Sequence, residues 1–184
     1  MGGSLLSNHP KWSKSKKHLM SFMCDSLHDR VDFQVINYRK AHDQLGRAVL
    51  TIDKVEMLTM CTLTAEREIY YKELAIRTQL NDFNDADAFK NQTIQTDAHE
   101  LLKKEGIYAQ YDFFSALEDY FNSPIERSLK SKDILIKILC LLDRRVGKRT
   151  LRNMQESILE EPALVYDFYK LRCNAEHITI HNAD

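Results

Sequence analysis

Hydrophobic and polar residues alternate along residues 31–38, and this period of two indicates a β-strand. The same alternation returns over residues 47–52 and 55–63. The polar segment 39–46 ends in glycine and suits a hairpin connection, while the pair Asp53-Lys54 suits a tight turn. These patterns predict a three-stranded antiparallel meander.

The third predicted strand is apolar on both of its faces. Met57 and Cys61 share one face, and Leu58 and Met60 share the other. Because a strand that carries apolar residues on both faces is typical of a covered position, we expect both faces to be covered.

Helical periodicity replaces alternation on both sides of the meander. Ser13 precedes an amphipathic stretch through Leu27 that predicts a first helix. From Thr64 onward the pattern predicts a bundle of about six helices. The apolar run Ile134 to Leu142 indicates a buried helix, and Ser123-Pro124 carries the chemistry of a helix start. Further helical patterns cover residues 64–80, 86–105, 111–121 and 151–158, with a last helix after Pro162 whose inward residues are Leu164, Phe168 and Leu171.

The predicted fold class is therefore α+β, within one domain. The chain has 184 residues, of which 43% are hydrophobic and 29% charged, as in an ordinary globular protein. We expect a flexible N-terminus over residues 1–10 and a single domain over residues 11–173, with a C-terminal tail at 174–184. Within the domain, residues 11–63 form the helix and meander and residues 64–173 the helical part.

Several features predict a cytoplasmic protein without a membrane partner. The longest apolar run has eight apolar residues in nine positions, whereas a bilayer span takes about 20. The N-terminus lacks the apolar core of a secretion signal. The cysteines Cys24, Cys61, Cys140 and Cys173 have no CxxC spacing and predict reduced core thiols.

One short segment concentrates positive charge, although the formal net charge of the chain is only -1. LDRRVGKRTLR, residues 142–152, follows the predicted buried helix, and Gly147 predicts a left-handed residue that stops it. Backbone N–H groups at the next helix start, together with cations, suit a phosphate or a carboxylate. We call this segment the basic corner; its cations are Arg144, Arg145, Lys148, Arg149 and Arg152.

The basic corner also admits a structural interpretation. Arg144 and Arg145 complement the dipole at a helix end, and Arg152 has a partner four residues on in Glu156. The remaining cations then form internal salt bridges to acidic pairs such as Glu118-Asp119 or Glu160-Glu161. Lys148 and Arg149 have no obvious partner nearby in the sequence.

A second basic cluster lies at the start of the first predicted helix. Lysines beside a tryptophan can bind phosphates and stack a base. The alternative is that the tryptophan anchors the helix to the core while the lysines stay solvated. The cluster consists of Lys11, Trp12, Lys14, Lys16 and Lys17.

The first hairpin connection holds the weak catalytic candidates. His42 beside Asp43, with the cations Arg39 and Arg47, could supply a base and anion-binding groups for a phosphorylated substrate. Adjacent residues on a strand point to opposite faces, so this pair would cooperate only in a turn. A solvated loop is the alternative.

No cofactor or metal site is predicted. His177 and His181 have helical metal-ligand spacing, but the β-branched residues between them argue against a helix, and a frayed or edge-strand tail is expected. The Gly-rich phosphate, serine-hydrolase and zinc-protease motifs are missing from the sequence.

Three stretches resemble a family of small, functionally uncharacterised bacterial cytoplasmic proteins. They are KWSKSKK near the start, Tyr38-Arg39 to Gly46-Arg47, and GIYAQYDFFSALEDYFNSPIERSL through LDRRVGKRTL. Some members are named as nonribosomal peptide synthetases, but this chain is too short for an adenylating enzyme and lacks an HHxxxDG motif. The resemblance implies a bacterial cytosolic setting and no reaction.

Three functions follow as hypotheses. The first is a non-enzymatic interaction protein whose basic corner binds an anionic partner, either nucleic acid or an acidic protein face. The second is an enzyme acting on a phosphorylated or nucleotide substrate at His42 and Asp43. The third is a structural homodimer or partner-neutralising protein, which requires a large exposed apolar patch, for instance on the second face of the meander.

Overall fold

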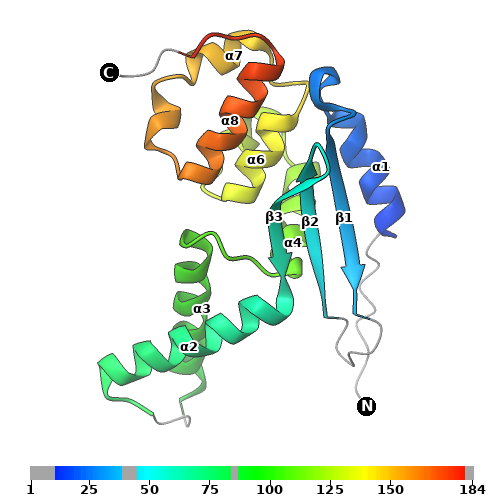
Figure 1. Ribbon diagram of the computed structural model, residues 1–184. Coiled ribbons are helices and arrows are strands. Elements are labelled where there is room, and N and C mark those ends of the chain that lie inside the picture. The colour runs from blue at the N-terminus through cyan, green and yellow to red at the C-terminus, as the bar shows by residue number, and fades with distance from the viewer. Residues whose placement is uncertain (1–10, 39–44, 84–86, 181–184) are drawn as a thin grey trace.

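The computed structural model describes residues 11–38, 45–83 and 87–180 (Figure 1). An N-terminal helix, a three-stranded antiparallel sheet and a series of helices follow one another, which confirms the predicted α+β class. The elements are α1 (Trp12–Phe22), η1 (Asp25–Leu27), β1 (Val31–Asn37), β2 (Gly46–Ile52), β3 (Val55–Cys61), α2 (Thr62–Leu80), α3 (Ala88–Lys104), α4 (Gln110–Phe121), α5 (Ile125–Ser128), α6 (Ile134–Leu142), α7 (Lys148–Asn153), η2 (Ser157–Glu160) and α8 (Ala163–Ala175).

The sheet has the strand order β1-β2-β3, so the predicted meander is confirmed. Its first hairpin pairs Val31 with Ile52 at one end and Asn37 with Gly46 at the other. In the second hairpin the turn residues Asp53 and Lys54 both have positive φ angles, 51° and 69°. This left-handed pair matches the twist of two strands joined by a two-residue loop.

One face of the sheet forms the main core together with α1 and α4. Phe33 of β1 stacks on Phe113 of α4 with 6.0 Å between ring centroids, and Leu19 of α1 is buried in the same cluster. Helix α6 packs against α4, and α8 packs against α6 in the upper part of the molecule (Figure 1). Seven of the nine residues of α6 are buried, as its apolar run predicted.

The expectation that β3 is covered on both faces was wrong. Leu58 and Met60 are buried against the core, but Met57 is 45% exposed. The register between β2 and β3 shifts at Leu50/Thr51, so Met57 stands outside the regular pairing. Thr59, two residues on, is exposed as well although its pairing with Val49 is regular, so this side of β3 is open to solvent.

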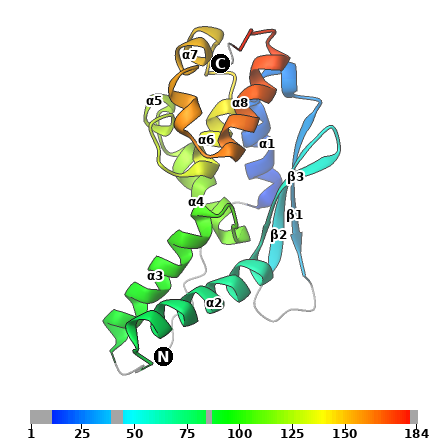
Figure 2. The same cartoon turned by 60° about the vertical axis from the view of Figure 1, so that its left-hand side comes forward.

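Helices α2 and α3 form an arm that projects from the rest of the molecule (Figure 2). The arm has a small core of its own, made of Ala65, Ile69, Ala98, Leu102 and Ala109. The predicted break between the two helices is confirmed: a left-handed asparagine at position 81 ends α2, and the carboxylate of residue 87 caps α3. Because this core is small and separate from the main core, few buried apolar side chains stabilise the arm.

Asp112 of α4 attaches the arm to the body. Its carboxylate, which is almost fully buried, accepts a hydrogen bond of 2.7 Å from the backbone N–H of Ala109. The same carboxylate contacts Nε2 of His99 in α3 at 2.9 Å. This polar contact fixes the orientation of α3 at its junction with α4.

Several predicted helix boundaries differ from the structure. The first helix begins at Trp12, so Ser13 lies inside it, and it stops at Phe22 because Met23 pairs with Asp143 as an isolated β-bridge. The strand signal of residues 55–63 overran by two residues into α2. The helix predicted around Leu151 is divided into α7 and η2.

The C-terminal segment packs against the body. Along α8 the buried residues include Val165, Phe168 and Tyr169, whereas Leu164 and Leu171 are only partly buried. Beyond the helix, residues 178–180 form no helix or strand, yet Ile178 is 5% exposed and belongs to the main core. Part of the predicted tail is therefore anchored. Within the described residues, no helix combines the length and apolarity that a bilayer crossing requires.

Gly46 of β2 has no room for a side chain. A Cβ at this position would lie 2.5 Å from the carbonyl oxygen of Ile36 and 2.7 Å from Nε2 of Gln110. That amide nitrogen donates to Oδ1 of Asn37 at 3.2 Å, so the Gln110 side chain crosses directly over the glycine. Only a residue without a side chain fits beneath it.

We expect Gly46→Ala to lower the free energy of unfolding by about 1–3 kcal/mol, because the methyl group must push both the Gln110 side chain and the β1 backbone away from residue 46. Urea denaturation measures the change. Gly147→Ala is the matched control, since a Cβ there meets no atom within 4 Å, and it should cost less than about 1 kcal/mol. Equal effects of the two substitutions would contradict the close approach.

Candidate interaction surfaces

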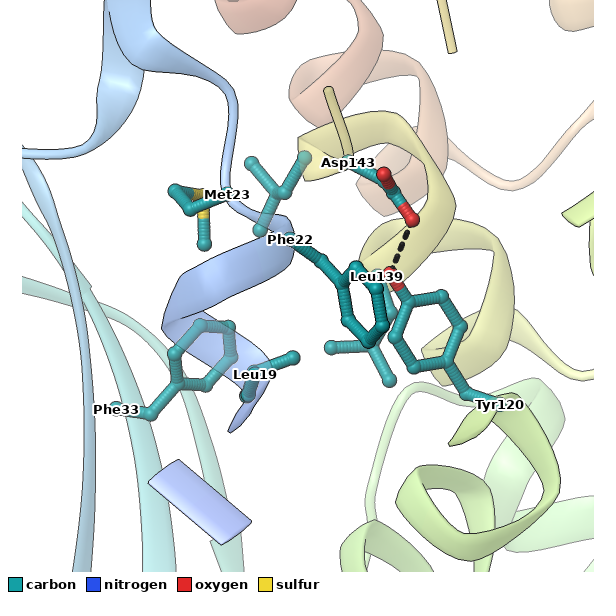
Figure 3. Close-up of a pocket in the computed structure, with 8 residues that line it drawn as sticks. Leu19, Phe22, Met23, Phe33, Tyr120, Leu139 and Asp143 are labelled. Carbon is teal, nitrogen blue, oxygen red and sulfur yellow. Dashed lines mark hydrogen bonds between the residues drawn. The ribbon is translucent and has the colours of Figure 1, made fainter. Parts of the chain in front are cut away.

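The basic corner starts from a turn whose geometry is set by a buried carboxylate. Asp143, at the end of α6, is 1% exposed. Its carboxylate accepts hydrogen bonds from the hydroxyl of Tyr120 in α4 and from the backbone N–H of Arg145, the latter at 2.7 Å. Figure 3 shows the Tyr120–Asp143 contact. Burial and this hydrogen bond raise the pKa of the Tyr120 phenol far above its ordinary value.

Arg145 is held by the same carboxylate and is therefore a structural residue. Its Nε and Nη2 donate to Asp143 at 2.8 and 2.6 Å, and the guanidinium lies 4.0 Å from the ring centroid of Phe22. The hydrogen bond to Asp143 raises the pKa of Arg145, so this guanidinium stays charged. A guanidinium that already donates to a buried carboxylate and lies on an aromatic face has fewer free donors for a ligand.

The prediction that Gly147 stops the buried helix in a left-handed conformation was wrong. Helix α6 already ends at Leu142, and Gly147 has a φ of -80° as the residue that precedes α7. The Asp143 carboxylate turns the chain by accepting the N–H of Arg145, so no left-handed residue is needed. Arg144 and Arg145 therefore lie in a turn beyond the helix.

A buried arginine that the sequence analysis missed completes this turn. Arg172 of α8, 3% exposed, donates to the carbonyl oxygens of Leu142 at 3.4 Å and Val146 at 3.1 Å. Its Nη2 also lies 3.3 Å from a carboxylate oxygen of Glu176. Glu176 lies four residues on along the sequence, but the two carbonyl oxygens belong to a distant segment and leave no signal in a sequence pattern.

Lys148, which has no obvious partner nearby in the sequence, contacts Glu176 in the structure. Its Nζ donates to the backbone carbonyl oxygen of Glu176 at 3.0 Å and lies 3.5 Å from the carboxylate of the same residue. The contact joins the start of α7 to the end of α8. Of the two cations that lacked a local partner in the sequence, this one is explained by a residue 28 positions away.

All five cations of the basic corner are exposed, but three lack contacts like those that Arg145 and Lys148 make: Arg144, Arg149 and Arg152. No ion pair joins any of them to another residue within 11–38, 45–83 or 87–180. The predicted pair between Arg152 and Glu156 does not form, because α7 ends at Asn153 before the next helical turn. The acidic partner Glu161 instead pairs with Lys137 of α6.

The second basic cluster supports the structural interpretation in part. Trp12 packs edge-on against Phe113 at 5.9 Å between ring centroids and lies against the main core. Lys16 pairs with Asp32 of β1 at 2.5 Å. The other lysines of the cluster, Lys11, Lys14 and Lys17, are exposed.

The weak catalytic candidates lie mostly outside the described residues. Arg39, His42 and Asp43 fall in the segment 39–44, and His181 falls after residue 180. Arg47 is described and lies 3.5 Å from a carboxylate oxygen of Glu56. Across the described parts of the chain, no group of three metal-ligating side chains gathers.

One narrow space between side chains is too small to be a ligand pocket. It lies between α1, β1, α4 and α6, bounded by residues such as Phe22, Phe33, Leu139 and Tyr120 (Figure 3). It has no room for even one water molecule. Chemistry on a small substrate has no setting there.

Three cysteines fit the expected core thiols and one does not. Cys24, Cys140 and Cys173 are buried, and burial raises the pKa of Cys140 to about 12. Cys61 is half-buried at the start of α2. Burial raises its pKa, but hydrogen bonds, chiefly from Thr64, outweigh this effect and lower the pKa below its ordinary value.

Exposed apolar side chains concentrate on the arm rather than on the sheet. Tyr70 is 62% exposed and Phe89 82% exposed, fractions that are unusual for large apolar residues. The sheet contributes fewer such residues. The exposed large apolar residues of the arm are Leu63, Tyr70, Tyr71, Leu74, Leu80, Phe83, Phe89 and Leu101.

The fold and these surfaces define a small α+β protein with an exposed cationic corner and an apolar projecting arm. The model of the SF0329 protein family matches residues 11–173, and the chain belongs to that family. The match covers the residues predicted to form the domain, whose division into parts stays a prediction. No curated protein and no solved structure matches the chain.

The turn after α6 can be tested by removing its charge. We expect Asp143→Asn to lower the free energy of unfolding by about 2–3 kcal/mol, because Tyr120 and Arg145 lose their charged acceptor. Urea denaturation provides the measurement. Asp119→Asn, on the exposed face of α4, should change the free energy by less than about 0.5 kcal/mol. A similarly small effect of Asp143→Asn would mean that the turn does not depend on the carboxylate.

Proposed function

We propose that this member of the SF0329 family is a non-enzymatic interaction protein that binds anionic groups of a partner at its basic corner. One observation supports the proposal above the others. Arg144, Arg149 and Arg152 are exposed without an ion pair to any described residue, while the neighbouring Arg145 and Lys148 are held internally.

The turn that carries these arginines is held by internal hydrogen bonds, which favours binding. Asp143 fixes the turn that carries Arg144, and Arg172 ties the same turn to α8. Arg149 and Arg152 are three residues apart on α7, so both lie toward one side of that helix. Cations on a backbone that is already ordered lose less conformational entropy when they bind.

Guanidinium groups suit this role because each presents a planar fork of donors to a carboxylate or phosphate. The formal net charge of -1 provides no long-range attraction to an anionic polymer. We therefore expect local, salt-sensitive binding. A nucleic acid and an acidic protein face share this chemistry, and the experiment distinguishes them.

Binding should be measured by fluorescence anisotropy on the full chain, with labelled duplex DNA, single-stranded DNA and polyglutamate as probes. If Arg144, Arg149 and Arg152 all contact duplex phosphates, the slope of log affinity against log salt should be about -2.7. Binding to polyglutamate alone identifies an acidic protein face as the partner class. The triple variant Arg144→Gln/Arg149→Gln/Arg152→Gln should lose the binding.

A control variant removes the same charge elsewhere. Lys104, Lys130 and Lys132 are exposed, and their combined replacement by glutamine should leave the affinity within about two-fold of wild type. Failure of all three probes to bind at low salt contradicts the proposal. Equal losses in the two triple variants would also contradict it, because the binding would then reflect overall charge.

A further inference from the structure

Helix α2 is apolar on two opposite faces. Its inner face places Ala65, Ile69 and Ile76 against the core of the arm. Its outer face carries Leu63, Tyr70 and Leu74 at spacings of seven and four residues, which align them along one side of a helix.

The outer residues form a continuous apolar stripe. Leu63 is 49% exposed, Tyr70 62% and Leu74 43%. From Leu63 to Leu74 the stripe runs about 17 Å along the helix axis. Tyr71, 56% exposed, widens it on one side. Tyrosine contributes large contact area with little loss of side-chain freedom, and it is enriched where protein partners bind.

The charges beside the stripe differ between its two edges. Glu66 and Glu73 lie one heptad apart along one edge, and neither forms an ion pair with another described residue. The opposite edge carries the neutral residues Tyr71 and Thr78. Arg67 lies close to the stripe, but its guanidinium pairs with Glu68 at 2.8 Å. Arg77 follows four residues after Glu73, and its guanidinium donates to Oδ1 of Asn91 in α3 at 2.8 Å. With two carboxylates and one guanidinium, this edge of the stripe is acidic on balance.

We propose that this outer face of α2 docks an amphipathic helix of a partner protein, whose apolar residues cover the stripe and whose lysine or arginine side chains face Glu66 and Glu73. Apolar residues at the spacing of successive helical turns suit a second helix laid alongside. The acidic edge selects a basic flank on that helix. This docking surface is independent of the basic corner.

A second copy of the chain fits this face less well. In an antiparallel two-fold pair of α2 helices, the same edge of each copy lies side by side, so Glu66 of one copy would approach Glu73 of the other. Like charges at such flanking positions oppose pairing. The charge pattern therefore favours a basic helix over self-association.

The proposal can be tested with two designed helical peptides of about 18 residues. Both carry leucines at heptad spacing; one has lysines along its flank and the other glutamates. Anisotropy with the full chain should show tighter binding of the lysine peptide, by about five-fold or more, with affinity that falls as salt rises. The charge-reversed variant Glu66→Lys/Glu73→Lys should invert this preference.

The apolar stripe is tested by Tyr70→Ser/Leu74→Ser, which should weaken binding of the lysine peptide by about 30-fold. Leu159→Ser is the matched control, since Leu159 is 48% exposed on η2, and it should bind as wild type. Each variant's circular dichroism should match that of wild type.

Three results would overturn the proposal: neither peptide binds, both bind equally once the basic corner has been neutralised as described next, or sedimentation velocity shows a dimer that Tyr70→Ser/Leu74→Ser dissociates. The measurement is repeated in the Arg144→Gln/Arg149→Gln/Arg152→Gln background, where the lysine peptide should bind unchanged. That background also removes binding of the glutamate peptide to the basic corner, so failure at one surface is distinguishable from failure at the other.

Discussion

The carboxylate of Asp143 lies where α1, α4 and the turn after α6 meet, and the helical layer depends on its hydrogen bonds. Tyr120 and Arg145 donate to it from two different elements. Around it, the backbone N–H of Arg144 donates to the carbonyl oxygen of Phe22 at 2.8 Å. A buried carboxylate is costly unless its lone pairs are used, so this charge imposes one arrangement on the segments that satisfy it.

The same turn explains why some cations of the basic corner are structural and others are exposed. Arg145 turns inward to Asp143, and Arg172 reaches across from α8 to the carbonyl oxygens of the turn. Lys148 is drawn toward the end of α8 by Glu176. Arg144, Arg149 and Arg152 are exposed and form no ion pair with a described residue. The contacts of Arg145, Lys148 and Arg172 thus order the backbone that carries the proposed binding groups.

Much of the fold could be predicted from local patterns. The alternation of residues 31–38 and 47–52 and the polar pair Asp53-Lys54 predicted the meander, because side-chain period and turn chemistry are local properties. The end of the first helix was not predictable in this way. It is set by the pairing of Met23 with Asp143, residues 120 positions apart in the chain.

The candidate surfaces, like the fold, could be predicted from the sequence only in part. The sequence identified a cluster of five cations but assigned the wrong conformation to Gly147, because the chain turns earlier, where the Asp143 carboxylate accepts the N–H of Arg145. Tyr70 and Leu74 belong to the helical pattern predicted over residues 64–80, but the pattern did not show that both are exposed. Helical spacing shows that two residues share a face, but only packing decides which face is covered.

The most direct test of the account is to follow the arginine Nε–Hε signals by NMR while an anionic probe is added to the full chain. If the basic corner binds the probe, the signals of Arg144, Arg149 and Arg152 should shift, while those of Arg145 and Arg172 stay unchanged because they are held internally. Shifts at Arg145 or Arg172, or shifts confined to other surfaces, would contradict the division between structural and binding cations.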